Sequence, residues 1–330
     1  MTILVTGSAG HLGEALMRTL GAAQRSVRGI DVKPSPFTDA VGSICDRALV
    51  QRSMNGVQAV IHTATLHKPH VATHSAQEFI AVNITGTSIL LEEAVAARVE
   101  AFVFTSTTSA FGAALTPTAG EPAAWVTEDI APVPRNIYGV TKVAAESLGE
   151  MVYRQHGLPV IVLRTARFFP EADDDAAVRG SYELANAQVN ELLHRRADIA
   201  DVVSAHLLAV ERARELGFGR YIISATTPFT PADLAALRHG AAEVVCRRFP
   251  HCEAVYAARG WSLFPEIDRV YVNARARTEL GWQPKYDFGH ALDRLDAGQD
   301  FRSALAVAIG SKGYHDRSFG DRPYPVGESI

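Results

Sequence analysis

An apolar run followed by three evenly spaced glycines constrains the fold of this chain more than any other feature. The run TILVT covers residues 2–6, and Gly7, Gly10 and Gly13 follow it. Where such a segment joins a strand to a helix, the first glycine permits a tight turn. The second lets backbone N–H groups approach a pyrophosphate, and the third lets the helix lie close against the strand. The pattern predicts a dinucleotide site, and a glycine-rich turn without a ligand is the alternative.

An acidic residue stands where a dinucleotide site requires one, about 20 residues after the glycines. Asp31 closes the β-rich run SVRGID at residues 26–31. A carboxylate there accepts hydrogen bonds from a ribose diol and repels a 2′-phosphate. Asp31 therefore strengthens the prediction and favours NAD. Lys33, two residues later, softens that preference, so NADP stays as the less favoured cofactor.

Strand-like and helix-like segments alternate along most of the chain. The strand-like runs are short, nearly continuous and rich in Val, Ile and Phe, which is typical of strands buried on both faces. They cover residues 2–6, 26–31, 57–62, 101–106, 159–164 and 219–224. Helical periodicity covers residues 75–98, 138–156 and 198–216, with a capping box at Ser75 and Glu78 and a terminal Gly157.

This alternation predicts an α/β fold, a Rossmann-type doubly wound parallel sheet with a smaller mixed α/β substrate lobe. The predicted NAD-binding domain covers residues 1–165, and residues 198–224 return to it. Residues 166–197 and 225–330 form the predicted small substrate-binding lobe.

Composition and charge restrict the partners that we expect. The chain has 330 residues and a net charge of −4, and no basic stripe indicates a nucleic-acid partner. Its first apolar run is too short for a signal peptide or a membrane span. Three cysteines in a chain of this length make no disulfide framework. We therefore expect a cytoplasmic protein that acts on a small molecule.

Two further segments carry groups suited to acid–base chemistry. Tyr138 and Lys142 in YGVTK are four residues apart, so they lie on one face of a helix. A neighbouring ammonium and a positively charged nicotinamide would lower the pKa of the phenol and make it a general base. The run at 101–106 leads into hydroxyl residues at 105–109, which suits a site at the carboxyl end of a parallel sheet. β-propensity with a serine turn is the alternative interpretation.

Taken together, these motifs resemble the extended short-chain dehydrogenase/reductase family, also called the NAD-dependent epimerase/dehydratase family. TGSAGHLG matches its T-G-x-x-G-x-x-G motif, YGVTK its Y-x-x-x-K motif and FTSTTSAFG its catalytic strand, while LGWQP resembles its late turn. The resemblance implies that Thr107, Tyr138 and Lys142 are catalytic. Tyr138 would take the proton of a secondary alcohol, Thr107 would hydrogen-bond the same oxygen, and Lys142 would hold the nicotinamide ribose.

The resemblance also implies a set of cofactor-binding residues. Asp46 would contact adenine, the backbone of Ala64 would line the cofactor, and Asn83 would support its pocket. His67 stands where sugar epimerases of the family often have a lysine near the nicotinamide ribose. The whole cofactor set is Gly7, Gly10, His11, Leu12, Gly13, Asp31, Asp46, Ala64, Asn83, Tyr138 and Lys142.

Departures from the family pattern bear on the reaction. Dehydratases of the family carry an acidic residue just after the catalytic threonine, but here Thr108 and Ser109 follow, which disfavours elimination.

Arg167 stands where epimerases of the family have an asparagine that contacts the substrate. The short span before Asp201 lacks the insertion that grips a nucleotide diphosphate, and it resembles the trimmed lobe of uronate dehydrogenases. Arg167 would then pair with a substrate carboxylate, or alternatively with the acidic residues at 173–175.

Three functions follow. The first is an NAD-dependent oxidoreductase acting on a secondary hydroxyl of a small sugar-like or sugar-acid substrate, with His67, Thr108 and Arg167 on the substrate side. The second is an NDP-sugar (UDP-hexose) 4-epimerase with tightly bound NAD, and the third is a non-catalytic NAD-binding regulator. The family implies a homodimer.

The loop after residue 66 contains three histidines. His67, His70 and His74 are spaced like metal ligands, but no carboxylate is interleaved and we expect no metal.

Overall fold

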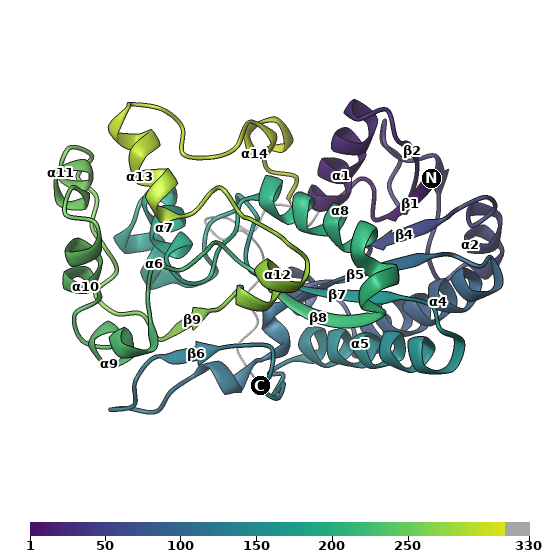
Figure 1. The fold of residues 1–330 in the computed structure, drawn as a ribbon, viewed down its shortest axis with the longest axis horizontal. Coiled ribbons are helices and arrows are strands. Elements are labelled where there is room, and N and C mark those ends of the chain that lie inside the picture. Colours follow the sequence, from purple (N-terminus) through teal and green to yellow (C-terminus); the bar gives the residue numbers. More distant parts are fainter. Residues whose placement is uncertain (314–330) are drawn as a thin grey trace.

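The computed structural model describes residues 1–313 of the chain. Seven parallel strands form one sheet in the order β3-β2-β1-β4-β5-β7-β8 (Figure 1). The strands are β1 (Thr2–Thr6), β2 (Ser26–Asp31), β3 (Ala40–Val41), β4 (Ala59–His62), β5 (Ala101–Thr107), β7 (Val160–Thr165) and β8 (Phe218–Ile223). Strand order reverses between β1 and β4, and open α/β sheets bind ligands beyond the carboxyl ends of their strands at such a point.

Helices cover both faces of the sheet. One face packs against α1 (His11–Ala22), α8 (Ile199–Leu216) and α14 (Ala304–Ile309). The other packs against α2 (Arg47–Ser53), α4 (Thr87–Ala96) and α5 (Ile137–His156). Along β1, Ile3 and Val5 enter the first core while Leu4 enters the second. Residues 3–6 of this strand are all buried, which explains its nearly continuous apolar sequence. The predicted doubly wound parallel sheet is confirmed.

The predicted helix at 75–98 is in fact three consecutive pieces. These are α3 (Ala76–Phe79), a π-helical stretch (Ile80–Gly86) and α4. Ser75 accepts a hydrogen bond from the backbone of Glu78, as its capping box predicts. The widened turn contains Asn83, and π-turns of this kind are frequent at functional sites. A propensity pattern does not distinguish i→i+5 from i→i+4 hydrogen bonds, so the π-helical turn was not predicted.

The same stretch is long and apolar enough to resemble a membrane-spanning helix. The window at Ala76–Ala96 has the length and mean hydropathy, 1.4, that a membrane-spanning helix requires, but half of it is buried inside the fold. Core helices of soluble proteins have the same property. The stretch therefore carries no argument for a membrane location.

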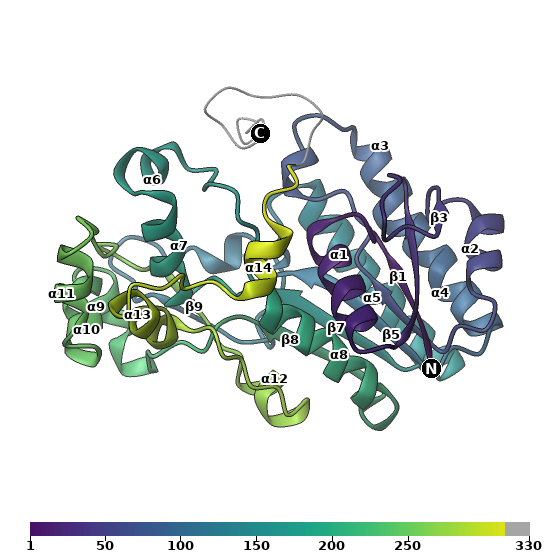
Figure 2. The same cartoon turned by 90° about the horizontal axis from the view of Figure 1, so that it is seen from above.

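A smaller lobe stands beside the carboxyl ends of the strands (Figures 1 and 2). Its two parallel strands are β6 (Ala124–Val126) and β9 (Arg269–Tyr271), which the sequence did not predict. Its helices are α6 (Ala176–Ser181), α7 (Leu184–Leu192), α9 (Leu234–Leu237), α10 (Ala241–Arg248), α11 (Cys252–Ala257) and α13 (Phe288–Asp296). They surround a separate apolar core built around residues such as Phe288. The division into two domains at the boundaries given above stays a prediction, and its part beyond residue 313 lies outside the described residues.

The late LGW turn docks the lobe onto the sheet. It follows α12 (Ala274–Glu279), and Trp282 is completely buried. The indole Nε1 donates to the carbonyl of Asp201, 3.1 Å away, and to the hydroxyl of Ser204. Both partners lie in the first turns of α8, so this tryptophan fixes the start of a sheet-covering helix.

The close approach of α1 to β1 predicts a large effect of one methyl group. A Cβ on Gly13 would lie 1.9 Å from the carbonyl oxygen of Gly7, whereas a Cβ on Gly21 in the same helix would meet nothing within 4 Å. Gly13→Ala should therefore displace α1, lower the free energy of unfolding by about 1–3 kcal/mol and weaken NAD binding. Gly21→Ala should be neutral or stabilise by about 1 kcal/mol. Urea unfolding and NAD titration measure both, and equal behaviour of the two variants would contradict this packing argument.

Candidate active site

A cavity of about 530 Å³ opens at the carboxyl ends of β1, β4 and β5 and reaches the small lobe. It brings together most of the predicted site residues, namely Gly7, Gly10, His11, Leu12, Gly13, Asp31, Ala64, His67, Thr107, Thr108, Tyr138, Lys142 and Arg167. Asp46 and Asn83 are not among the residues that line it. The cavity thus joins the glycine-rich loop to the predicted catalytic groups.

The glycine-rich loop has the geometry of an anion cradle. Gly7 has φ +73°, a conformation that favours glycine, and its N–H donates to the carbonyl of Ile30 at 2.7 Å. A Cβ on Gly7 would lie 2.8 Å from the backbone nitrogen of Ala64. Helix α1 begins after Gly10 without a side-chain cap. Its first backbone N–H groups and positive helix end therefore suit a pyrophosphate.

Asp31 holds this loop as well as lining the cavity. One carboxylate oxygen accepts from the backbone of Ala9 at 2.9 Å and the other from the backbone of Lys33 at 2.8 Å. A carboxylate oxygen has a further lone pair, so each can also accept from a ribose hydroxyl. The residues present fit the dinucleotide that the sequence predicted.

A buried chain of hydrogen bonds ties β1 and β4 to the helical layer. The hydroxyl of Thr6 lies 2.7 Å from Nδ1 of His62, and Nε2 of His62 lies 3.0 Å from the hydroxyl of Thr87. Thr87 donates to the carbonyl of Asn83 at 2.7 Å, so His62 is the donor to Thr87. Burial, with the nearby Lys142 charge, holds the pKa of His62 well below its usual value. This series of hydrogen bonds requires a neutral imidazole, because Nε2 of His62 donates while Nδ1 accepts.

Asn83 supports the cavity wall from behind. Its side-chain oxygen accepts from the backbone of Leu66 at 2.8 Å and from the hydroxyl of Thr65, while its amide donates to the Leu66 carbonyl and to Thr141. It fixes the loop after β4 against α5. Asp46, in contrast, is exposed and caps α2 by accepting from the backbone of Leu49, so its predicted contact with adenine stays a prediction.

The three predicted catalytic side chains are buried together. Thr107 and Tyr138 are each 8% exposed and Lys142 is 2% exposed. Burial raises the pKa of Tyr138 to about 12, although its hydrogen bond to Thr107 acts in the opposite direction. Burial lowers the pKa of Lys142 to about 7, which the Glu146 carboxylate partly opposes.

The prediction that the Lys142 ammonium lowers the pKa of Tyr138 is wrong as far as the protein's own side chains are concerned, because burial raises that pKa. The Lys142 ammonium donates to the carbonyl of Thr105 at 2.7 Å and lies 4.4 Å from the ring centroid of Phe104. It is held by β5 rather than paired with the phenol. The sequence placed both residues on one helix face correctly, but a shared face does not fix where a long lysine side chain ends.

Arg167 is engaged by its own loop. One Nη donates to the carboxylate of Asp173 at 3.3 Å, and the other donates to the carbonyls of Glu171 and Ala172 at 2.9 and 2.7 Å. This is the intramolecular pairing that the sequence left open. Binding of a substrate carboxylate by Arg167 stays a prediction.

The histidine-rich loop forms one wall of the cavity. The backbone N–H of His67 donates to Nδ1 of His70 at 3.1 Å, and the His67 ring lies 5.6 Å from that of Phe169. Burial lowers the pKa of His67 well below its usual value, so it is neutral. Within residues 1–313, no three His, Cys, Asp or Glu side chains are grouped to hold a metal.

Residues Ser311–Gly313, here called the strap, cross the start of α1 and were not predicted from the sequence. The hydroxyl of Ser311 donates to the carboxylate of Glu171 at 2.8 Å, and the ammonium of Lys312 pairs with Glu14. Lys312 and Gly313 line the cavity. These partners lie 140 and 298 residues apart in the sequence and leave no local signal, so only the tertiary structure shows the contacts.

A second missed residue, Glu146, lies beneath the catalytic pair. It is 1% exposed and accepts hydrogen bonds from Ser106 at 2.6 Å, from two guanidinium nitrogens of Arg164 and from Arg220. Its spacing of four residues from Lys142 was the signal available, because it places Glu146 on the buried face of α5.

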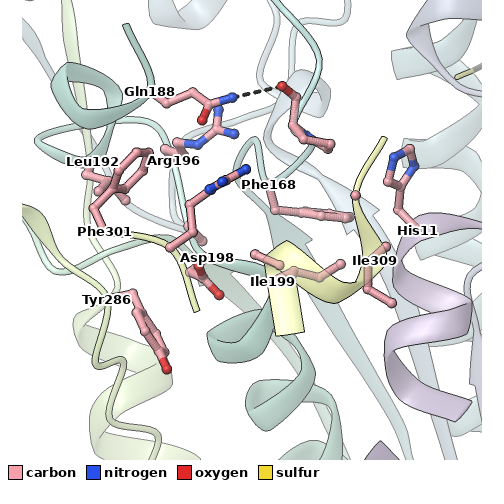
Figure 3. Close-up of a pocket in the computed structure, with 15 residues that line it drawn as sticks. His11, Phe168, Gln188, Leu192, Arg196, Asp198, Ile199, Tyr286, Phe301 and Ile309 are labelled. Atoms are coloured by element: carbon pink, nitrogen blue, oxygen red, sulfur yellow. Dashed lines mark hydrogen bonds between the residues drawn. The ribbon is translucent and has the colours of Figure 1, made fainter. Parts of the chain in front are cut away.

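A smaller cavity of about 40 Å³ lies between the lobe and the sheet (Figure 3). Figure 3 shows Arg196, Phe301 and Ile309 around it, with Gln188 donating to the carbonyl of Pro170 at 2.8 Å. This volume suits water rather than a sugar. The larger cavity is therefore the candidate active site.

The model of the NAD dependent epimerase/dehydratase family matches residues 3–223. The chain belongs to this family. The match confirms the resemblance drawn from the glycine-rich and Y-x-x-x-K motifs, and NAD is the cofactor of the family.

Individual relatives carry different activities. An NAD-dependent glucose-6-phosphate dehydrogenase of Haloferax volcanii is 33% identical over 178 residues, which are 49% of this chain and 66% of that protein. A dTDP-glucose 4,6-dehydratase of Streptomyces niveus is 31% identical over 185 residues, 50% of this chain and 53% of that protein. The chain thus matches less than two thirds of the length of these relatives.

Among solved structures, a short-chain dehydrogenase/reductase superfamily protein of Agrobacterium tumefaciens with bound NAD is similar. It has 24% sequence identity and a TM-score of 0.63, covering 90% of this chain and 96% of that one. At this identity, the likeness shows a shared fold.

The Glu146 contacts predict a sharp difference between two neighbouring carboxylates. Glu146→Gln leaves Arg164 buried without a charge partner and should lower the free energy of unfolding by about 3–5 kcal/mol. Glu150→Gln, whose side chain is 24% exposed and also pairs with Arg220, should cost no more than about 1 kcal/mol. Urea unfolding compares them, and similar losses would contradict the role assigned to Glu146.

Proposed function

We propose that the protein is an NAD-dependent oxidoreductase that oxidises a secondary hydroxyl of a small sugar-like or sugar-acid substrate. The observation that carries this proposal is the single cavity in which Thr107, Tyr138 and Lys142 meet the glycine-rich loop and Asp31. A chain that only sensed the dinucleotide would have no need of three buried reactive groups beside it. We assign the cofactor and catalytic roles to these residues as the sequence predicted them.

The side chains have distinct roles in the proposed reaction. Tyr138 takes the proton of the substrate hydroxyl, and Thr107, already hydrogen-bonded to that phenol, contacts the same oxygen. Bound NAD would supply the hydride acceptor and a positive charge that would oppose the effect of burial on the pKa of Tyr138. Lys142, whose ammonium donates to the carbonyl of Thr105, would hold the nicotinamide ribose.

Two observations favour a substrate without a nucleotide. The span between β7 and α8 holds only the Arg167 loop and the short helices α6 and α7. The relative from Haloferax volcanii is named for glucose 6-phosphate, a sugar without a nucleotide.

The residues after the proposed catalytic threonine disfavour a dehydratase. They are Thr108 and Ser109, so no carboxyl group stands at that place to assist the elimination of water.

One feature favours the alternative, an NDP-sugar 4-epimerase that retains its NAD. The strap is fixed to α1 by the Lys312–Glu14 pair and lines the cavity, which would slow exchange of the dinucleotide.

We also propose a cytoplasmic location and a homodimer, which follow from the family resemblance and the composition.

Net formation of NADH separates these functions. With added NAD and a panel of sugars, sugar acids and UDP-sugars, the proposed enzyme should produce NADH, measured by its absorbance. Tyr138→Phe should lower that rate at least about 100-fold, because the general base is lost, with NAD binding retained. UDP-sugar interconversion without free NADH would establish the epimerase instead. Turnover that persists in Tyr138→Phe would overturn the mechanism.

A further inference from the structure

Three arginines line the part of the cavity that faces the small lobe. They are Arg167 after β7, Arg195 after α7 and Arg269 in β9. Cations in a concave site raise the local concentration of anions, and here they do so in a protein whose net charge is −4. The question is which of the three has a hydrogen-bonding edge left for a ligand.

The first two arginines share their charge with buried carboxylates. Arg195 lies 2.7 Å from Asp173 and 2.9 Å from Glu191, whose side chains are 5% and 2% exposed. Arg167 contacts the same oxygen of Asp173 and the carbonyls of its own loop. These contacts order the loop after β7. A ligand would have to displace them to reach either guanidinium.

Arg269 is less engaged. Among the described residues its one carboxylate contact is with the preceding residue, where Nη1 lies 3.0 Å from an oxygen of Asp268. The Asp268 side chain is 38% exposed, and an ion pair of this kind contributes little. The Nε atoms of all three arginines are buried without a hydrogen-bond partner among the described residues, so they do not separate Arg269 from the other two. The difference lies in the Nη groups, because those of Arg269 contact only this exposed carboxylate among the described residues, whereas those of Arg167 and Arg195 contact the buried Asp173.

The backbone holds Arg269 in a fixed place. Residues Arg269–Tyr271 pair with Ala124–Val126 in the small parallel sheet, and Tyr271 is buried beside the cavity. A guanidinium on such a strand can present its two Nη groups side by side, which matches two oxygens of a carboxylate or a phosphate.

We propose that Arg269 binds an anionic group, a carboxylate or a phosphate, of the sugar-like substrate. This rests on the proposed function, because the anion is placed at the lobe side of the cavity while the hydroxyl to be oxidised meets Tyr138. It moves the anion site from Arg167, the residue that the sequence indicated, to a strand that the sequence did not predict.

The test compares anionic and neutral sugars in the NADH assay. D-Glucuronate, D-glucose 6-phosphate and D-glucose are tested on the wild type, on Arg269→Gln and on Arg277→Gln, a matched control at an exposed position of α12. The wild type should prefer one of the two anions, and which one distinguishes carboxylate from phosphate. Arg269→Gln should lower kcat/KM for that anion about 10- to 100-fold, mainly through KM. D-Glucose turnover and the control should be unchanged.

Two results would overturn the proposal. One is a wild type that prefers the neutral sugar, and the other is a loss in Arg269→Gln that is equal for neutral and anionic sugars. Thermal unfolding of each variant separates a local effect from misfolding. If no sugar yields NADH, the proposed function fails, and calorimetric titration of D-glucuronate and of inorganic phosphate into the NAD-saturated protein still decides the inference. Binding that Arg269→Gln weakens at least 10-fold supports it, and binding that is absent or unaffected contradicts it.

Discussion

The buried carboxylate of Glu146 holds α5 to the sheet, and the geometry of the candidate site depends on it. It joins α5 to β5 through Ser106, to β7 through Arg164 and to β8 through Arg220. Buried charges are tolerated only when their partners are placed well. The network therefore specifies one position of α5 relative to the strand ends. Tyr138 and Lys142 lie two turns and one turn away on the same helix.

A second constraint acts on the opposite side of the cavity. The absence of a side chain at Gly13 lets α1 approach the Gly7 carbonyl, and Asp31 holds the loop between them through the backbone of Ala9. The N-terminus of α1 and the phenol of Tyr138 consequently line one cavity although they belong to different layers. Chemistry between a bound dinucleotide and a substrate requires this arrangement, because hydride transfer needs the two reactants in contact.

Local sequence predicted the elements whose neighbours impose a strict pattern. All six predicted strands are present. The central ones, such as β4 and β7, are buried along their whole length, and a strand covered on both faces is rich in apolar residues. Gly157 ends α5 with φ +70°, as expected for a left-handed cap. The glycine-rich loop and the Tyr138–Lys142 pair line one cavity, and the spacing within each motif was the signal that indicated their placement. Their roles toward cofactor and substrate stay predictions.

The features that the sequence did not reveal depend on contacts between distant segments. The strap meets α1 across almost the whole chain, and β6 pairs with β9 across the small lobe. Arg167 was identified as a cavity residue, but its partner Asp173 could be chosen only once the loop was folded. The lysine of the catalytic pair likewise contacts Thr105 rather than the phenol. Each case concerns where a long side chain or a short strand ends, which periodicity does not determine.

In the proposed reaction, a hydrogen leaves the substrate carbon and departs with the dinucleotide. The most direct measurement uses a sugar that the enzyme oxidises, deuterated at every carbon, with added NAD, and locates the deuterium by mass spectrometry. One deuterium should appear in NADH that is free in solution, in amounts equal to the oxidised sugar. Deuterium that stays entirely in a rearranged sugar, with no labelled NADH released, would contradict it.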